Sequence, residues 1–361
     1  MLRGIDAGAF SYATSLRSVV LENDSLRTVG DSLFHGCTSL KAVVWNGNQP
    51  LMPTAFDEKS YTHLLVYLPE TMEFEHPLIE SGHMALIKDG QCSSLTLHDL
   101  KPFYCPIPFT VGHVEYKHFY AQSTGLGSSA GWETLALPFD VAKIRHEGKG
   151  DIAPFGVDAT YNFWLAEPAD GGFDPTITIR ANKPYIIAMP NHTAYGNDLL
   201  NGNVVFSADN VLIHATDELA PYHGTEYSMI PSFDEIKRCD SVYALNVSLK
   251  FDKYAAGSVF APNRKDVMPF SAYMVPAEKN QGAPMFRIQM RPEAEDVVYS
   301  LSVTVAGGIV YVTLPEDRAI TVYDMVGRKV CVIDGMEGVN EISHLPQGMY
   351  MIEKTKVYVK R

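Results

Sequence analysis

The sequence predicts a mainly β protein in three parts: a short repeat solenoid, a β-sandwich and a small C-terminal sandwich. Three observations predict this. A 24-residue pattern recurs near the N-terminus, short apolar runs separated by Gly, Pro, Asn and Asp fill the middle, and a tighter strand pattern ends the chain. At 361 residues the chain also exceeds what one hydrophobic core usually serves. We expect the parts to span 1–70, 85–292 and 300–361.

The repeat is clearest in segments 9–21 and 33–45, which align after a shift of 24 positions, and 55–69 keeps only its strand. The period and the Leu-x-x-φ-x-φ spacing are those of leucine-rich repeats, whose alternate strand side chains point into the solenoid. The units resemble the BspA-like leucine-rich repeats of bacterial surface proteins, which carry an "AF" and a "C-T-S-L" in these relative places. The matching residues are Ala9-Phe10 with Ala13-Thr14-Ser15-Leu16, and Leu33-Phe34 with Cys37-Thr38-Ser39-Leu40.

The strand register divides the repeat side chains into an inner and an outer set, because neighbouring strand residues face opposite sides. We expect the inner, buried set to be Leu16, Val19, Leu21, Leu40, Val43 and Trp45. The outer set is the candidate partner-binding face: Ser18, Val20, Ala42 and Val44. Each repeat covers its neighbour, so segment 70–83, the best candidate for a short helix, should cover one end and upstream repeats the other. Leu2, Ile5 and Phe10 should then lie near an exposed edge.

The middle of the chain has the pattern of strands joined by turns. Apolar runs predict strands at 132–139, 176–179, 184–189, 204–206 and 270–275. Several of these runs end in proline, which cannot donate to a β-ladder and therefore lies at strand ends or edges. The spacing favours antiparallel sheets packed as a sandwich over βαβ units.

The last 60 or so residues predict further strands at 310–314, 320–323, 329–333, 340–342, 349–352 and 356–359, with a hairpin connection at 324–327. We expect a small immunoglobulin-like sandwich that buries Val310, Val312, Ile320, Val322 and Tyr350. The segment resembles the C-terminal sorting domain of the Bacteroidetes type IX secretion system. That domain carries V-Y-D-x-x-G-(R/K)-x-V, then I-x-x-L-x-x-G-x-Y, then a basic final strand, which match 322–330, 342–350 and 356–361.

Composition excludes several classes of function. The net charge of −13, from 29 Lys and Arg against 42 Asp and Glu, repels phosphate, so we do not expect nucleic acid as a partner. No apolar run approaches the ~20 residues of a membrane-spanning helix. Residues 1–10 lack the basic start and apolar core of a signal peptide, so we expect an upstream segment to be missing.

The five cysteines do not have the spacing of a zinc site or a disulfide framework. We expect each to pack as a small buried hydrophobe, although Cys92 and Cys105 could close one loop. His113, Glu115 and His118 lie close in sequence, but the helical H-E-x-x-H spacing is not met and strand alternation points His118 away from the other two. Surface positions are therefore expected for these three, with neither a metal nor an organic cofactor.

Segment 127–131 satisfies the G-x-S-x-G pattern of a hydrolase nucleophile elbow. That elbow needs a helix directly after the serine, whereas 132–139 is predicted to be a strand, so we do not expect Ser129 to be a nucleophile. No Gly-Lys-Ser/Thr follows, which excludes a phosphate-binding P-loop.

Carboxylates suited to glycosidase chemistry are plentiful but cannot be paired from sequence alone; they are Glu133, Asp140, Asp158, Glu167, Asp170 and Asp174. Four aromatic residues could stack on a sugar ring: Trp132, Tyr161, Phe163 and Trp164. Alternation separates Trp164 from Tyr161 and Phe163, and aromatic residues of a sandwich more often fill its core.

These observations favour a non-catalytic, exported binding or adhesion protein of the extracellular or outer-membrane surface. The resemblances imply a protein of Bacteroidetes type, and BspA-like relatives are associated with attachment to host proteins or other cells. The ligand would be a protein or a glycan, including one of host origin. The alternative is a cell-surface glycan-binding or glycan-degrading protein; an enzyme of that kind would have two carboxylates about 5 to 9 Å apart between aromatic walls.

Overall fold

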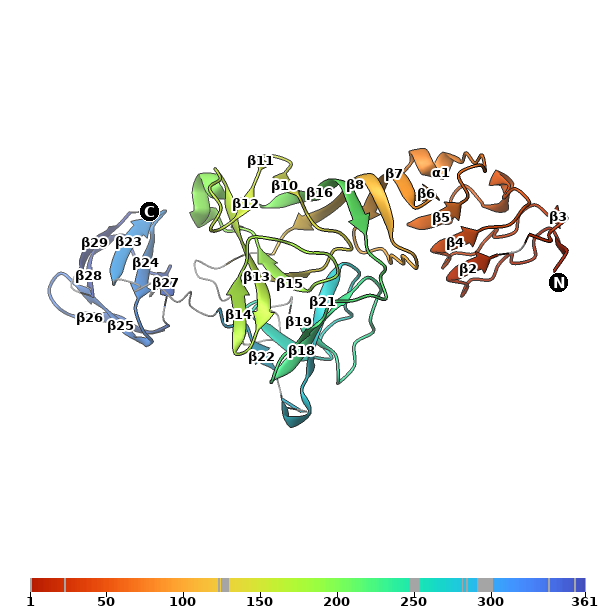
Figure 1. The fold of residues 1–361 in the computed structure, drawn as a ribbon. Coiled ribbons are helices and arrows are strands. Elements are labelled where there is room, and N and C mark those ends of the chain that lie inside the picture. The colour runs from red at the N-terminus through yellow and green to blue at the C-terminus, as the bar shows by residue number, and fades with distance from the viewer. Residues whose placement is uncertain are drawn as a thin grey trace.

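A computed structural model describes residues 2–22, 24–122, 124, 130–246, 254–280, 282–283, 285–290, 301–336, 338–353 and 355–360. Over these residues the chain is mainly β, with stacked coils at its N-terminal end (Figure 1). The helices among them are short: α1 (Pro77–Glu80), and the 3-10 helices η1 (Pro53–Ala55), η2 (Thr193–Asp198) and η3 (Glu278–Asn280). Helix α1 lies within 70–83, where the sequence predicts one.

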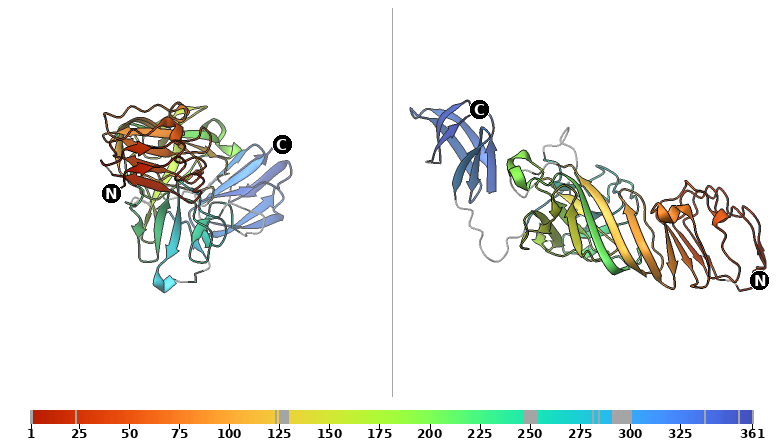
Figure 2. Two further views of the ribbon diagram at one scale, coloured as in Figure 1. Left: turned by 90° about the vertical axis from the view of Figure 1, so that its right-hand side faces the viewer. Right: turned by 90° about the horizontal axis from the view of Figure 1, so that it is seen from above.

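One nine-stranded sheet of the described chain runs from the repeats into the middle part. In spatial order its strands are β11 (Gly150–Asp151), β10 (Lys143–His146), β16 (Gly202–Ile213), β8 (Phe109–Tyr120), β7 (Gln91–His98), β6 (Met84–Lys88), β5 (Leu64–Leu68), β4 (Ala42–Trp45) and β2 (Ser18–Leu21). Strands β2, β4, β5 and β6 are parallel. Strand β7 turns back beside β6 but runs parallel to β8, which departs from the purely antiparallel pairing expected. Figure 2 shows the repeat strands at one end of this row.

The stacked coils follow the predicted period. Ser18 pairs with Ala42 and Leu21 with Trp45, the shift of 24 found in the sequence. Three phenylalanines stack through consecutive coils: the Phe10 and Phe34 ring centroids are 5.6 Å apart, and those of Phe34 and Phe56 are 5.4 Å apart. Strands β1 (Gly4–Ile5) and β3 (Thr28–Val29) pair on another side of the coils. Segment 55–69 is therefore a third coil.

The predicted inner side chains share one core. Leu40, Val43 and Trp45 are fully buried, whereas their first-coil counterparts Leu16, Val19 and Leu21 are half-buried against the same core. Leu2 is exposed, as expected for an edge, and Phe10 is half-buried. The expectation for Ile5 is wrong: this side chain is buried, because β1 pairs with β3 and places it in the repeat core.

Two further sheets of the described chain complete the middle part: a five-stranded sheet packs on the large sheet, and a six-stranded sheet packs on the five-stranded one. The five-stranded sheet contains β12 (Ala153–Pro154), β13 (Asn162–Ala169), β15 (Tyr185–Ala188), β9 (Glu133–Leu135) and β14 (Gly172–Pro175). The six-stranded sheet contains β17 (Tyr222–His223), β18 (Tyr227–Ser232), β21 (Ser271–Pro276), β19 (Tyr243–Leu245), β20 (Val259–Pro262) and β22 (Phe286–Arg287).

The five-stranded sheet is the middle layer, because its alternate residues belong to two different cores. Leu165 and Ile187 pack toward the nine-stranded sheet, whereas Ala166 and Ile186 pack toward the six-stranded sheet. The middle of the chain is thus three sheets deep rather than the two of a single sandwich.

The predicted strands of the middle part are confirmed for 184–189, 204–206 and 270–275, which contain β15, part of β16 and β21. Segment 132–139 forms only the short β9, and 176–179 is not a strand. The reason is that these apolar segments bond to loops: Val141 N–H donates to the Ile179 carbonyl, and His214 N–H to the Pro138 carbonyl.

The C-terminal part has a three-stranded and a four-stranded sheet within the described residues. The first contains β23 (Ser302–Ala306), β24 (Ile309–Leu314) and β27 (Gly338–Ile342), and the second contains β26 (Lys329–Gly335), β25 (Arg318–Asp324), β28 (Gly348–Ile352) and β29 (Thr355–Val359). The five residues predicted to be inside are all buried in one core. The hairpin at 324–327 joins β25 to β26 as predicted.

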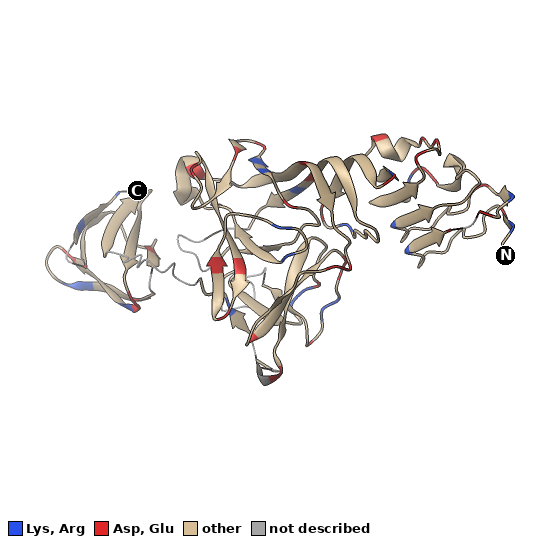
Figure 3. Cartoon of the chain, viewed as in Figure 1, with Lys and Arg blue, Asp and Glu red and all other residues tan. Residues whose placement is uncertain are grey.

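Charged side chains are scattered over all three parts, with acidic and basic residues interspersed (Figure 3). Among the helices of the described residues, none is long and apolar enough to cross a membrane.

Candidate functional site

The structure divides the predicted partner-binding face into an open and a covered half. Val20 is 61% exposed and Ser18 is half-buried on β2, whereas Ala42 and Val44 on β4 are 0% and 3% exposed. The prediction that Ala42 and Val44 face outward to solvent is therefore wrong. They do point away from the repeat core, but into a second core that the middle part of the chain builds on that face.

The connection between β7 and β8 covers this half of the face. Tyr67 of β5, which pairs with Val44, donates its hydroxyl to the Ile107 carbonyl at 2.8 Å and packs edge-on against Phe109. Phe103 and Cys105 from the same connection belong to the same core. The connection also reaches the first coil, where Tyr104 lies against Arg17, but it leaves Val20 of β2 exposed.

A surface groove of about 410 Å³ begins beside the open half. Arg17 and Ser18 line it together with Tyr104, Asp217, Ile230 and Tyr273. Arg17 lies 4.5 Å from the Tyr104 ring centroid and forms a 2.6 Å ion pair with Asp234, so the groove combines aromatic, apolar and charged surface. A protein segment or a glycan could contact such a surface.

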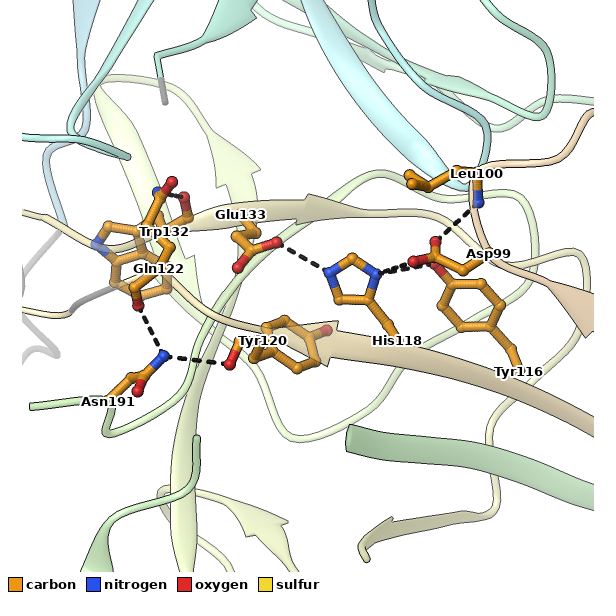
Figure 4. A network of polar contacts seen from close by, with 9 residues as sticks. All are labelled: Asp99, Leu100, Tyr116, His118, Tyr120, Gln122, Trp132, Glu133 and Asn191. Atoms are coloured by element: carbon orange, nitrogen blue, oxygen red, sulfur yellow. Dashed lines mark hydrogen bonds and ion pairs between the residues drawn. The ribbon is translucent and has the colours of Figure 1, made fainter. Parts of the chain in front are cut away.

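A second site, which the sequence analysis missed, centres on His118 of β8. Its Nδ1 lies 2.8 Å from Asp99 Oδ2, and its Nε2 lies 2.9 Å from Glu133 Oε2 (Figure 4). Asp99 directly follows β7, and Glu133 begins β9 in the neighbouring sheet, so three separate segments supply the three side chains. The prediction of a surface position holds for His113, which is exposed and pairs with Asp209, and is wrong for His118.

Strand alternation explains why His118 is covered. It shares a strand face with Val114, Tyr116 and Tyr120, all buried, whereas His113 and Glu115 are on the opposite face as predicted. Nearby chain segments hold the arrangement: the Asn191 amide donates to the Tyr120 and Gln122 carbonyls, and the Gln122 amide to the Trp132 carbonyl (Figure 4). A histidine within an apolar alternating run was the one signal available in the sequence.

The network holds His118 in its charged form. Burial alone would lower the pKa of the imidazole, but the hydrogen bonds and negative charges of Asp99 and Glu133 outweigh it and raise that pKa to about 9. Burial would likewise raise the pKa of Asp99, yet the hydrogen bonds from His118 and Tyr116 and the His118 charge hold it below its usual value. An imidazolium flanked by two carboxylates is the expected state at neutral pH.

This arrangement is not that of a catalytic triad or a metal centre. Both His118 nitrogens donate to carboxylates, so neither has a lone pair free to act as a general base or to bind a metal. The imidazole also stands between the two carboxylates, where a glycosidase would place its substrate. No group of three His, Cys, Asp or Glu side chains suited to a metal ion occurs among the described residues.

The network lines a cavity of about 110 Å³. Asp99, Tyr116, His118 and Tyr120 line it from the nine-stranded sheet and its connection, and Trp132 and Glu133 line it from the start of β9. Lys265, in the connection between β20 and β21, lines the remaining side. Gly257 lets the β20 end approach: its φ is +65°, and a Cβ there would clash with the Trp132 backbone.

The remaining candidates have other roles. Ser129 lies outside the described residues, and the segment after it begins β9, a strand, not the helix that a nucleophile elbow requires. Asp140 is paired with Arg180, and Asp170 accepts hydrogen bonds from Tyr222 and Thr225. Trp132 and Phe163 are buried, and Trp164 packs in a different core from Phe163. The cysteines are free thiols. Cys37, Cys92 and Cys105 are buried as expected, whereas Cys331 is only half-buried and Cys239 is exposed, against the expectation.

Cys92 and Cys105 each donate to a nearby carbonyl, that of Ser94 and of Ile107 respectively, so the structure does not join them. Burial raises the pKa of the Cys92 thiol to about 11 and that of Cys105 to about 12. Both therefore stay protonated at neutral pH and act as small apolar residues.

No protein-family model and no curated protein matches the chain. Among solved structures, a β-glucuronidase from Ruminococcus gnavus is similar at 11% sequence identity with a TM-score of 0.12, over 63% of this chain and 34% of that enzyme. The chain thus spans about a third of the length of that protein. A similarity this weak supports no argument about fold or function.

Proposed function

We propose that this chain is an exported cell-surface binding protein without catalytic activity, and that its recognition surface is the groove beside the first repeat coil. The observation that carries the proposal is the exposed Val20 on β2, next to a groove of about 410 Å³ that Ser18 enters. Exposed apolar side chains beside a groove with aromatic and charged walls are typical of protein-binding surfaces.

The position of β2 supports a protein partner. It is the end strand of the nine-stranded sheet, and within the described residues only β4 pairs with it. An end strand offers backbone N–H and C=O groups to an extended segment of a partner, and side chains beside the strand then select the sequence. Arg17 and Tyr104 lie in the adjoining groove and could make that selection.

Substitution of Val20 tests the surface. We expect Val20→Lys to leave the protein folded and to weaken binding to any ligand captured from arrays of matrix proteins and glycans. Val157→Lys is the matched control, because Val157 is also exposed but belongs to the middle part. Unchanged binding by the Val20→Lys variant would move the recognition site off the repeats, and turnover of a glycan would refute the non-catalytic role.

The export part of the proposal rests on the resemblance of 322–361 to the type IX sorting domain. In a Bacteroidetes host that carries this system, deletion of 300–361 should leave the protein in the periplasm, as shown by cell fractionation and surface labelling. Display at the surface without this segment would refute the sorting role and leave the groove proposal intact.

A glycan-degrading role has less support. Of the carboxylates considered, Glu133 bonds to His118, Asp140 to Arg180 and Asp170 to Tyr222. Each of these three carboxylates is thus held in an interaction with a neighbouring side chain.

A further inference from the structure

The cavity beside His118 contains polar groups whose hydrogen-bonding capacity is not used by the residues that the structure describes. Lys265 lines the cavity, and no hydrogen bond or ion pair joins its ammonium to another described residue. Burial lowers the pKa of this ammonium, and the nearby Glu133 charge partly offsets that effect. An ammonium has three donors, and these are available to a ligand in the half-buried site.

Glu133 has a hydrogen-bond acceptor without a partner among the described residues. One of its oxygens accepts from His118, and the other has no hydrogen-bond partner among the described residues. Glu133 and Lys265 attract one another, yet no nitrogen and oxygen of the pair lie within 4.0 Å. An atom that both donates and accepts would connect them, and a hydroxyl group does both: it donates to the carboxylate and accepts from the ammonium.

The charges of the cavity favour a neutral ligand. His118 and Lys265 contribute two positive charges, and Asp99 and Glu133 contribute two negative ones. Asp99 is fully engaged, because it accepts hydrogen bonds from Tyr116, His118 and the Leu100 backbone. Glu133 therefore offers an unused acceptor and Lys265 offers unused donors, and their opposite charges disfavour a free anion or cation.

The walls and the size narrow the class of ligand further. Trp132, Tyr116 and Tyr120 present aromatic surface, on which the C–H groups of a sugar can pack. The volume of about 110 Å³ is smaller than the ~150 Å³ cavity that holds benzene. One edge of a sugar ring can enter such a space, whereas an internal residue of a glycan chain cannot.

We propose that this cavity binds the hydroxyl-bearing edge of a neutral sugar, with Lys265 and Glu133 bridging a sugar hydroxyl and His118 holding Glu133 in place. The site lies between the stacked sheets of the middle part and is separate from the groove at β2. It goes beyond the proposed binding surface, since either site could function without the other. Its ligand would be a free monosaccharide or the terminal residue of a glycan.

The test uses the full chain and methyl glycosides of neutral hexoses. We expect saturable binding in the millimolar range by calorimetry, and a change in the NMR signal of the His118 side chain as the cavity fills. Lys265→Met and Glu133→Gln should each weaken binding at least about tenfold, because each removes one side of the hydroxyl bridge. Lys143→Met, which removes a lysine of an exposed ion pair with Asp151, should leave binding unchanged.

Three results would overturn the proposal: no glycoside shifts the His118 signal at saturation, Lys265→Met binds as well as the parent, or only acidic sugars bind. The His118 NMR signal of the unmodified chain reports on binding by itself, so the test remains valid even if a cavity variant fails to fold. A glycan array distinguishes a glycan end from a free monosaccharide as the ligand. Binding to terminal neutral residues on the array would identify a glycan, whereas binding to methyl glycosides alone would identify a free sugar. Val20→Lys should not affect any of these measurements, so failure here leaves the groove proposal standing.

Discussion

The nine-stranded sheet has two halves that use the same backbone pairing for different purposes. In the repeat half, β4 and β5 bury apolar side chains on both faces. In the middle half, β8 alternates buried and exposed residues and places a charged histidine inside. The strand pairing alone therefore does not determine which side chains can be buried. The elements that pack on each face of the sheet determine it.

Two histidines make the contrast concrete. His63, which precedes β5, donates from Nδ1 to the Pro102 carbonyl and accepts from the His98 N–H at Nε2. Burial lowers its pKa to about 3, and the Pro102 hydrogen bond only partly opposes that shift. His118 is also well covered, but its two carboxylate partners raise its pKa to about 9. We therefore expect a neutral imidazole at His63, just before β5, and a charged one at His118 in β8.

We expect the largest difference in stability between variants at equivalent positions of two coils in the repeat half. Val44→Lys places an ammonium in the core that Tyr67 and Phe109 share, and we expect a loss of about 3 kcal/mol or more in the free energy of unfolding. Val20→Lys, its counterpart 24 residues earlier, should change that free energy by less than about 0.5 kcal/mol. Denaturant unfolding measures both. Equal effects would mean that the middle part does not cover β4.

In the middle half, we expect a similar loss of stability when a buried charged residue is removed from between its partners. His118→Leu leaves Asp99 and Glu133 without their shared partner, so we expect a loss of about 3 kcal/mol. His113→Leu, on the exposed face of the same strand, breaks only a surface pair with Asp209 and should cost less than about 1 kcal/mol. If denaturant melts gave the same cost for both, the His118 network would contribute nothing to stability.

The sequence predicts the repeat half better than the middle half for a physical reason. The coils are joined by contacts that repeat every 24 residues, so Phe10, Phe34 and the paired strands β2 and β4 follow from local period alone. The burial of Val44 depends on a connection some 60 residues away, and the His118 site on Asp99, Glu133 and Lys265 converging from separate segments. The spacing of residues within a single sequence does not show which distant segments will meet in the fold.

The contributions of the two histidines to folding stability should depend on pH in opposite directions. The pKa of His63 is lowered from an unfolded value near 6.5, so its contribution is present above about pH 6.5 and is lost as the pH falls toward 3. The pKa of His118 is raised, so its contribution is complete below about pH 6.5 and is lost as the pH rises toward 9.

NMR titration of labelled histidines measures both values directly. We expect the His63 signal to remain that of neutral imidazole well into the acid range, and the His118 signal to remain that of imidazolium past neutral pH. In unfolding experiments, His63→Gln should flatten the acid limb of the stability profile and His118→Gln the alkaline limb. Titration of both histidines near pH 6.5 would contradict the buried environments described above.

The smallest change in stability is expected at the open end of the coil stack, where the Phe10 ring has one stacked neighbour and the Phe34 ring has two. Phe34 is fully buried and stacks on both Phe10 and Phe56, so Phe34→Leu removes two ring contacts and should cost about 1 to 2 kcal/mol. Phe10 is half-buried and stacks on Phe34 alone, so Phe10→Leu should cost about half as much. Thermal melts of the two variants, made under one set of conditions, test the ratio. A larger cost at Phe10 would mean that the first coil is covered by something the described residues do not include, and the groove at β2 would then be a poor candidate for a free recognition surface.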